Sequence, residues 1–256
     1  MLNRYLRGET AFLSGAFRNM GLVIAKSLAD CGANIVLNDL PGVLDSSEMD
    51  NLLDDIRNRG VKAMILEGDI ASLDEVSEFR KAISSEIGSV SIVVNCAGPF
   101  NIEPYLKLDP KEWDSVMNVN LKSVYLTAQV FAPDMQKKQW GRIVNLSAGS
   151  SLIRNHGVYG LAKAGVSFLT EELALELGPD NITVNAIAPG QIEESLPEVY
   201  KIDPTFGERY LARTPLRKLV NREDIAGIVT FLCSSSANML TGLTLRADGG
   251  AELPKF

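Results

Sequence analysis

Residues 14–21 read SGAFRNMG. They follow an apolar run at 10–15 and lead into a helical pattern that begins near Met20. A glycine-containing turn between a buried strand and a helix is the setting of a phosphate-binding loop, because N–H groups at the start of the helix face the anion. Gly15 would allow a sharp exit from the strand, and Gly21 would allow the helix to pack closely on the sheet. Taken alone, the stretch also fits an ordinary strand–helix turn.

Asn19 stands where the usual pattern has its middle glycine. Asparagine tolerates left-handed backbone angles better than most residues other than glycine. We therefore predict that Asn19 leaves the turn intact.

The cofactor class depends on Asp39, which ends an apolar run 18 residues after Gly21. A carboxylate there can accept hydrogen bonds from an adenine ribose and would repel a 2′-phosphate. Arg18 argues the other way, since it could pair with that phosphate, and Asp39 could also be a surface residue of a turn before Pro41. The position of Asp39 favours NAD over NADP.

The rest of the chain alternates short apolar runs with longer helical patterns. We expect strands near 10–15, 34–39, 62–69, 91–98, 141–147, 181–190 and 243–248. We expect helices near 20–30, 47–59, 73–87, 111–139, 158–177 and 222–235, with a kink or break at Pro133. This order predicts one doubly wound α/β domain over residues 1–256, a seven-stranded, mostly parallel sheet with helices on both faces.

Composition argues against several classes of protein. The net charge is −7 without a basic cluster, so a nucleic-acid partner is not expected. No apolar run reaches the length of a membrane span, and the first nine residues lack a signal-peptide core. Cys31, Cys96 and Cys233 are widely spaced, as reduced thiols of a cytoplasmic protein would be. His156 is the only histidine, so we expect no histidine-rich metal site and no metal.

Tyr159 and Lys163, in the stretch YGLAK, lie four residues apart on one face of a predicted helix. A nearby ammonium favours a phenolate and would lower the pKa of the tyrosine from about 10. Tyr159 could then act as a general acid/base at a carbinol oxygen. Because such a pair also arises by chance, its meaning depends on the motifs around it.

From about Gly8 to Gly250 the chain resembles the short-chain dehydrogenase/reductase family. The resemblance rests on an ordered set of motifs: the turn at 14–21, Asp39, GD at 68–69, NCAG at 95–98, NVN at 118–120, GRIVNLS at 141–147, YGLAK at 159–163, ITVNAIAPG at 182–190 and ADGG at 247–250.

The resemblance implies a Rossmann-type fold and hydride transfer between a nicotinamide cofactor and a secondary alcohol or ketone. Tyr159 would move the proton. Lys163 would lower the pKa of Tyr159 and hold the nicotinamide ribose, and Asn120 would anchor a water of the proton relay. It implies cofactor contacts from Gly15, Arg18, Asn19, Met20, Gly21, Asp39, Asp69, Ile70, Asn95, Ala97, Gly98, Tyr159, Lys163, Pro189, Gly190 and Ile192. Purely structural interpretations remain open: Asn95 as a strand-end cap, Asn120 as a helix-kink residue, and Pro189-Gly190 as a plain turn.

Two further positions depart from the family's pattern. Ala148 stands where the family has its catalytic serine, and the segment before Tyr159 is about two residues short. Our hypothesis is that Ser147 takes the serine's role, with Ser150 and Ser151 as other candidates; all three could equally be solvent-facing serines of a loop. Glu194 replaces a threonine near the expected nicotinamide, where its carboxylate could still accept from the carboxamide.

Residues 191–218 mix charged and aromatic side chains, among them Tyr200, Phe206 and Tyr210, as a lid over a small-molecule substrate would. An amphipathic surface helix pair fits the same pattern. The family resemblance also implies a homotetramer or dimer. The missing serine keeps a second function open: a cofactor-binding protein on the same fold with weakened catalysis and a regulatory or scaffolding role.

Overall fold

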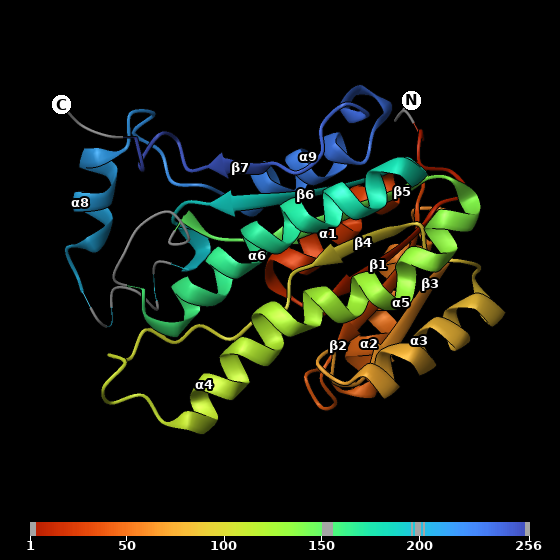
Figure 1. The fold of residues 1–256 in the computed structure, drawn as a ribbon, viewed down its shortest axis with the longest axis horizontal. Coiled ribbons are helices and arrows are strands. Elements are labelled where there is room, and N and C mark those ends of the chain that lie inside the picture. Colours follow the sequence, from red (N-terminus) through yellow and green to blue (C-terminus); the bar gives the residue numbers. More distant parts are fainter. Residues whose placement is uncertain (1–3, 150–155, 196, 198–200, 202, 254–256) are drawn as a thin grey trace.

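The computed structural model describes residues 4–149, 156–195, 197, 201 and 203–253. Within these ranges seven strands form one sheet in the order β3-β2-β1-β4-β5-β6-β7, and every neighbouring pair is parallel (Figure 1). The strands are β1 Thr10–Ser14, β2 Asn34–Asp39, β3 Ala63–Glu67, β4 Ile92–Asn95, β5 Gly141–Leu146, β6 Ile182–Pro189 and β7 Thr244–Ala247. The predicted α/β fold is confirmed.

Helices cover both faces of the sheet (Figure 1). One face packs on α1 Asn19–Asp30, α2 Ser46–Arg57 and α9 Arg222–Leu232. The other packs on α3 Leu73–Glu86, α5 Ser123–Lys138 and α6 Gly157–Leu177. Neighbouring residues of one strand serve the two cores: Leu13 belongs to the first and Phe12 to the second. The central strands β1, β4 and β5 are buried along their whole length, as both faces of the sheet are covered there, while the outer strands β3 and β7 are only partly buried.

The strand order decides where a ligand can bind. The chain winds outward from β1 to β3, then crosses back to β4 beside β1. At such a switch point the loops after two adjacent strands diverge and leave a crevice at the carboxyl ends. The sequence segments at 14–21 and 95–98 follow β1 and β4, so both border this crevice.

The predicted kink or break at Pro133 is not where the long helical region is interrupted. Helix α5 continues through Pro133, and the interruption is a π-helical turn, Asn118–Lys122, between α4 Pro110–Met117 and α5. Proline removes the hydrogen bond to the carbonyl four residues earlier. That residue, Gln129, is exposed, so water can satisfy its carbonyl.

Candidate active site

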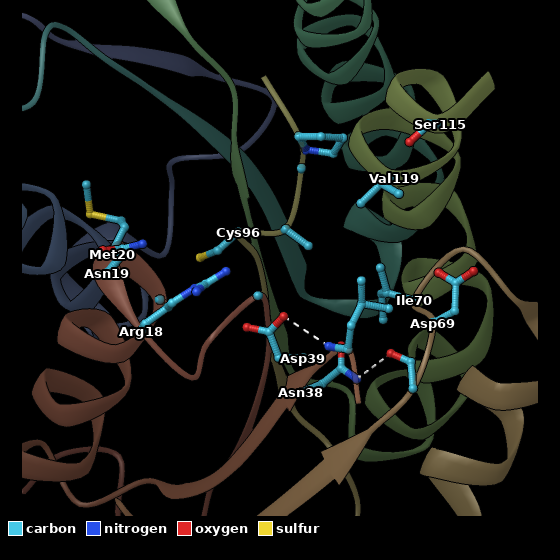
Figure 2. A pocket seen from close by; sticks show the side chains of 17 residues that line it. Arg18, Asn19, Met20, Asn38, Asp39, Asp69, Ile70, Cys96, Ser115 and Val119 are labelled. Carbon is cyan, nitrogen blue, oxygen red and sulfur yellow. Dashed lines mark hydrogen bonds between the residues drawn. The ribbon is translucent and has the colours of Figure 1, made fainter. Parts of the chain in front are cut away.

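A cavity of about 540 Å³ opens at the switch point (Figure 2). It brings together ten of the sixteen predicted cofactor contacts: Gly15, Arg18, Asn19, Met20, Gly21, Asp39, Asp69, Ile70, Ala97 and Gly98. It also has lining residues that were not among the predicted cofactor contacts: Asn38, Leu40, Gly68, Cys96, Pro99, Ser115 and Val119. Most of these neighbour a predicted contact in the chain, but Ser115 and Val119 come from α4 and the π-helical turn.

The turn at 14–21 has the backbone that its sequence predicts. Gly15 and Asn19 both have positive φ, +62° and +54°. Gly21 packs so closely that a Cβ there would lie 2.5 Å from the carbonyl oxygen of Gly15. Arg222 donates to the Asn19 Oδ1 at 3.1 Å. Asn19 is therefore held in the left-handed conformation by its own side chain and by α9.

The N-terminus of α1 has free donors. Helices α2, α3, α4 and α9 are capped by the side chains of Asp45, Ser72, Asp109 and Asn221. Helix α1 has Arg18 at its N-cap, with no side-chain cap hydrogen bond and no acidic residue in its first turn. Unpaired N–H groups and the helix dipole attract an anion there. The wall of the cavity thus fits a pyrophosphate.

Asp39 and Arg18 both line the cavity, and Figure 2 places them on the same side of it. The Asp39 carboxylate accepts from the backbone N–H of Leu40 at 3.0 Å and of Phe17 at 3.4 Å. Those bonds fix the carboxylate at the end of β2, next to the glycine turn. A carboxylate and a guanidinium therefore meet the same end of any bound dinucleotide.

Asn95 does not line the cavity, contrary to the expected cofactor contact. It is buried at the end of β4, where it donates to Asn145 Oδ1 at 2.8 Å and accepts from the Thr127 hydroxyl at 3.0 Å. Its amide ties β4 to β5 and α5. These bonds give Asn95 a structural role at the end of β4, and its contact with a cofactor stays a prediction.

Tyr159 and Lys163 lie on α6, past the carboxyl end of β5. Lys163 is buried, its Nζ donates to the Leu146 carbonyl at 2.7 Å, and it lies 5.6 Å from the centre of the Tyr159 ring. Phe100 packs edge-on against Tyr159 with ring centres 4.9 Å apart. The i,i+4 spacing thus brings the two side chains together, although neither is a wall of the cavity described above.

The expected lowering of the tyrosine pKa is not what this geometry produces. Burial raises the pKa of Tyr159 to about 12. Burial also lowers the pKa of Lys163, from 10.5 to about 8. Desolvation disfavours the charged form of each group, and Lys163 directs its ammonium at a carbonyl rather than at the phenol. At neutral pH this leaves a neutral phenol beside a largely protonated amine.

Asn120 lies in the π-helical turn and is buried. Its Nδ2 donates to the carbonyls of Pro99 at 2.9 Å and Val116 at 3.1 Å, while its Oδ1 has no hydrogen-bond partner. A Cβ on Gly98 would lie 2.0 Å from that Oδ1. The side chain therefore links the π-helical turn to the loop after β4 and lies against the cavity wall at Gly98.

Pro189, Gly190 and Ile192 leave the end of β6 and do not line the cavity either. A Cβ on Gly190 would lie 2.6 Å from the Tyr210 hydroxyl, which accepts from the Gln191 N–H at 3.0 Å. Helix α8, Phe206–Arg213, is thereby fixed to the end of β6. Glu194 lies exposed in a short 3₁₀ turn, Glu193–Ser195. Tyr200 lies outside the described residues.

A family model described as enoyl-(acyl carrier protein) reductase matches residues 15–252. The chain belongs to the short-chain dehydrogenase/reductase family. A 3-oxoacyl-[acyl-carrier-protein] reductase FabG of Staphylococcus epidermidis is 35% identical over 244 residues, which cover 94% of this chain and 98% of that protein. This assigns the protein to the oxidoreductases that use a nicotinamide cofactor.

Solved structures of this family are close in three dimensions. A gluconate 5-dehydrogenase from Burkholderia cenocepacia J2315, in complex with NADP and tartrate, has a TM-score of 0.90 and 29% identity, covering 99% of each chain. A 7α-hydroxysteroid dehydrogenase with NADH and 7-oxo glycochenodeoxycholic acid has a TM-score of 0.88 and 32% identity, covering 97% of this chain and 96% of that one.

As a short-chain dehydrogenase/reductase, the chain lacks a hydroxyl at Ala148, which is buried. The Ser147 hydroxyl is buried too, 3.0 Å from the Lys163 carbonyl, to which it donates, and 2.9 Å from the Ser167 hydroxyl. This geometry does not support Ser147 as the donor to a substrate. Its hydroxyl bonds to the backbone of α6, so Ser147 positions the helix that carries Tyr159 and Lys163. Ser150 and Ser151 lie outside the described residues.

Within the described ranges, no group of three or more His, Cys, Asp and Glu side chains could hold a metal ion. Among the described helices, none is long and apolar enough to cross a bilayer.

Proposed function

We propose that this protein is an NAD(H)-dependent oxidoreductase that interconverts a secondary alcohol and a ketone, working as a single domain over residues 1–256. One observation carries the proposal: Tyr159 and buried Lys163 lie together beyond the carboxyl end of β5, next to the strands that frame the dinucleotide-sized cavity. The cofactor, when bound, supplies or accepts the hydride.

Tyr159 is the proposed proton carrier. Within the described structure its hydroxyl makes no hydrogen bond, and with a pKa of about 12 it holds its proton at neutral pH. It can therefore give that proton to a ketone oxygen as negative charge develops there. The nearby Lys163 ammonium then stabilises the phenolate that remains. In the oxidation direction the step runs in reverse, and the phenolate form of Tyr159 accepts the proton of the alcohol.

The proposed cofactor contacts are the ten cavity residues, with Tyr159, Lys163, Pro189, Gly190 and Ile192 on the nicotinamide side. Residues 191–218 are proposed as the substrate lid, because Tyr210 holds α8 against Gly190 and Gln191. Asn120 is proposed as the residue that orders the proton path behind Gly98.

NAD is the cofactor that Asp39 favours, because its carboxylate would meet the 2′-phosphate of NADP with like charge. The similar solved structures contain NADP in one case and NADH in the other, so the residues at the cavity must decide. Equilibrium binding of NADH and NADPH should favour NADH in the wild type. Asp39→Ser should strengthen NADPH binding at least tenfold, whereas Arg18→Ser should weaken it. Tighter binding of NADPH than NADH by the wild type would contradict the assignment.

The alternative function is cofactor binding with weakened catalysis. Ala148 favours it, because this position lacks the hydroxyl of the family's catalytic serine. An NADH-oxidation screen separates the two, run on a 3-oxoacyl thioester, a keto-sugar acid and a keto-steroid, the carbonyl classes that the similar proteins' names suggest. The oxidoreductase should turn over at least one of them, and Tyr159→Phe should reduce that rate by 100-fold or more while leaving NADH affinity unchanged. Tight NADH binding without turnover, unaffected by Ala148→Ser, would favour the alternative function.

We propose a homo-oligomer, dimer or tetramer, that acts on a small-molecule substrate in the cytoplasm. Exposed apolar side chains lie along α5 and α6, at Tyr125, Leu161, Phe168 and Leu175. The three cysteines are free, as they would be in a reducing compartment.

A further inference from the structure

A second cavity, of about 200 Å³, lies at the amino-terminal end of the sheet, away from the dinucleotide site. Its walls are Tyr5, Leu6, Glu9, Trp140, Arg142, Cys233, Ser235 and Asn238. Arg142 is the second residue of β5, while Leu146, which holds Lys163, is the last. In Figure 1 the segment before β5 and the loop after α9 lie toward the end of the molecule marked N. This cavity is separate from the proposed reaction.

The feature that sets this cavity apart is a buried guanidinium. Arg142 is only 2% exposed. It donates through Nη1 to the Gly141 carbonyl at 2.7 Å and through Nη2 to Asn238 Oδ1 at 2.6 Å, while its Nε has no partner. The Trp140 ring lies 4.5 Å from its Cζ. A guanidinium has five N–H donors. Toward the described residues, Arg142 uses two of them.

The charge of Arg142 has no carboxylate partner among the described residues. Glu9 lines the same cavity, but it is paired with Lys138 and accepts from the Ser91 hydroxyl. Burial raises the pKa of Cys233 to about 12, so that its thiol is neutral. The two cations Arg142 and Lys138 and the one carboxylate of Glu9 give this cavity a net charge of one positive unit. A buried charge without an ionic partner destabilises the folded state, so an added anion here would be stabilising.

We propose that this cavity binds a small oxyanion of the carboxylate or phosphate class, held by the guanidinium of Arg142. The planar guanidinium fork matches both anions, and charge-assisted bonds of this kind are about twice as strong as neutral ones. The volume corresponds to several water molecules at about 30 Å³ each, enough for such an anion. Ser235 and Asn238, at the mouth, provide further polar groups. The site does not depend on the oxidoreductase activity.

Trp140 provides a direct readout. The chain has two tryptophans, Trp113 and Trp140, so Trp113→Phe leaves Trp140 as the only one. The variant is titrated with sodium phosphate and, separately, with sodium acetate, each at constant ionic strength maintained with NaCl. We expect a saturable change of Trp140 fluorescence and a rise in Tm with at least one anion. A response to one anion only identifies its class.

A pair of serine variants links the response to the cavity. Ser235→Glu puts a carboxylate at the exposed mouth, where it would compete for Arg142, and should weaken binding of the added anion at least tenfold. Ser236→Glu, one residue further in the same 3₁₀ turn and not a wall of the cavity, is the matched control and should bind normally. Fluorescence and Tm that follow NaCl alone, or equal anion binding by the two variants, would overturn the proposal.

Discussion

At the scale of single residues, the turn at 14–21 contains one non-glycine residue with a glycine-like backbone and one glycine that no larger residue can replace. Asn19 takes a positive φ, as glycine would, and Arg222 bonds to its side chain. Gly21 has ordinary helical geometry, but a Cβ there would overlap the backbone at Gly15 and Ala16. Asn19 thus takes the backbone conformation that the missing glycine would take, while the last glycine is a packing requirement.

Gly21→Ala should therefore destabilise the protein by about 1–3 kcal/mol through overpacking. It should also weaken NADH binding at least tenfold, because the start of α1 moves away from the pyrophosphate. Thermal unfolding and equilibrium binding measure the two effects. Gly178→Ala is the control, since a Cβ there would meet no atom within 4 Å. Wild-type cofactor affinity in Gly21→Ala would contradict this account of the turn.

At the same scale, Lys163 should make the free energy of unfolding depend on pH. Its pKa falls from 10.5 to about 8 because burial disfavours the charged amine. Between these values the unfolded chain binds more protons at this site than the folded chain, so stability should rise with pH there. The free energy of unfolding of the wild type, relative to Lys163→Met, should increase by roughly 2 kcal/mol from pH 8 to pH 10.

Urea unfolding of the two proteins across this pH range checks the expectation. Titrating groups far from Lys163 are present in both proteins, so their contributions largely cancel in the difference. Cys96, whose pKa burial raises and Lys163 lowers, is replaced by Ala in both proteins. The lost hydrogen bond to Leu146 changes the offset but not the slope. A difference that stays constant with pH would mean that Lys163 titrates normally.

At the scale of elements, the interruption between α4 and α5 is a π-helical turn rather than a proline kink. Such turns are frequent at functional sites. Here Val119 of the turn lines the dinucleotide cavity, and Asn120 bonds to Pro99 in the loop after β4. The turn therefore joins the helix layer to the cavity wall.

Asn120→Asp should test the hydrogen bonds of the Asn120 amide, because the carboxylate has the same shape but cannot donate to the carbonyls of Pro99 and Val116. Each buried carbonyl left without a donor costs about 1–3 kcal/mol. We expect the free energy of urea unfolding to fall by roughly 2–4 kcal/mol. The control, Asn118→Asp, lies exposed in the same turn and should stay within about 0.5 kcal/mol of the wild type. Equal effects of the two variants would contradict the role of the Asn120 amide.

At the scale of the whole molecule, one helix surface argues for assembly. Leu161, Phe168 and Leu175 are spaced by seven residues on α6 and are 45%, 64% and 75% exposed. That spacing keeps them on one face of the helix, as in a coiled-coil seam. An apolar stripe of this kind marks an interaction surface.

Sedimentation velocity should accordingly find a dimer or tetramer, and Phe168→Glu should shift it to a smaller species by introducing a charge into the interface. Leu73→Glu, on α3 and also 45% exposed, should leave the assembly unchanged. A wild type that sediments only as a monomer would rule out the proposed oligomer.

The sequence by itself determined the order of strands and helices, the nucleotide turn and the residues that follow the strands of the switch point. These follow from hydrophobic periodicity and from backbone preferences at positions such as Gly15 and Asn19, which act over a few residues of chain. Parallel strands then bring their carboxyl ends to one edge, so most of the cavity wall could be predicted.

Only the tertiary structure decided what each polar group meets. Asn95 faces Asn145 and Thr127 instead of the cavity, and Ser147 bonds to the carbonyl of Lys163 instead of a substrate. The sequence likewise did not reveal the high pKa of Tyr159 or the unsatisfied Nε of Arg142. Hydrogen-bond partners and desolvation depend on residues far apart in the chain, and no local pattern encodes them.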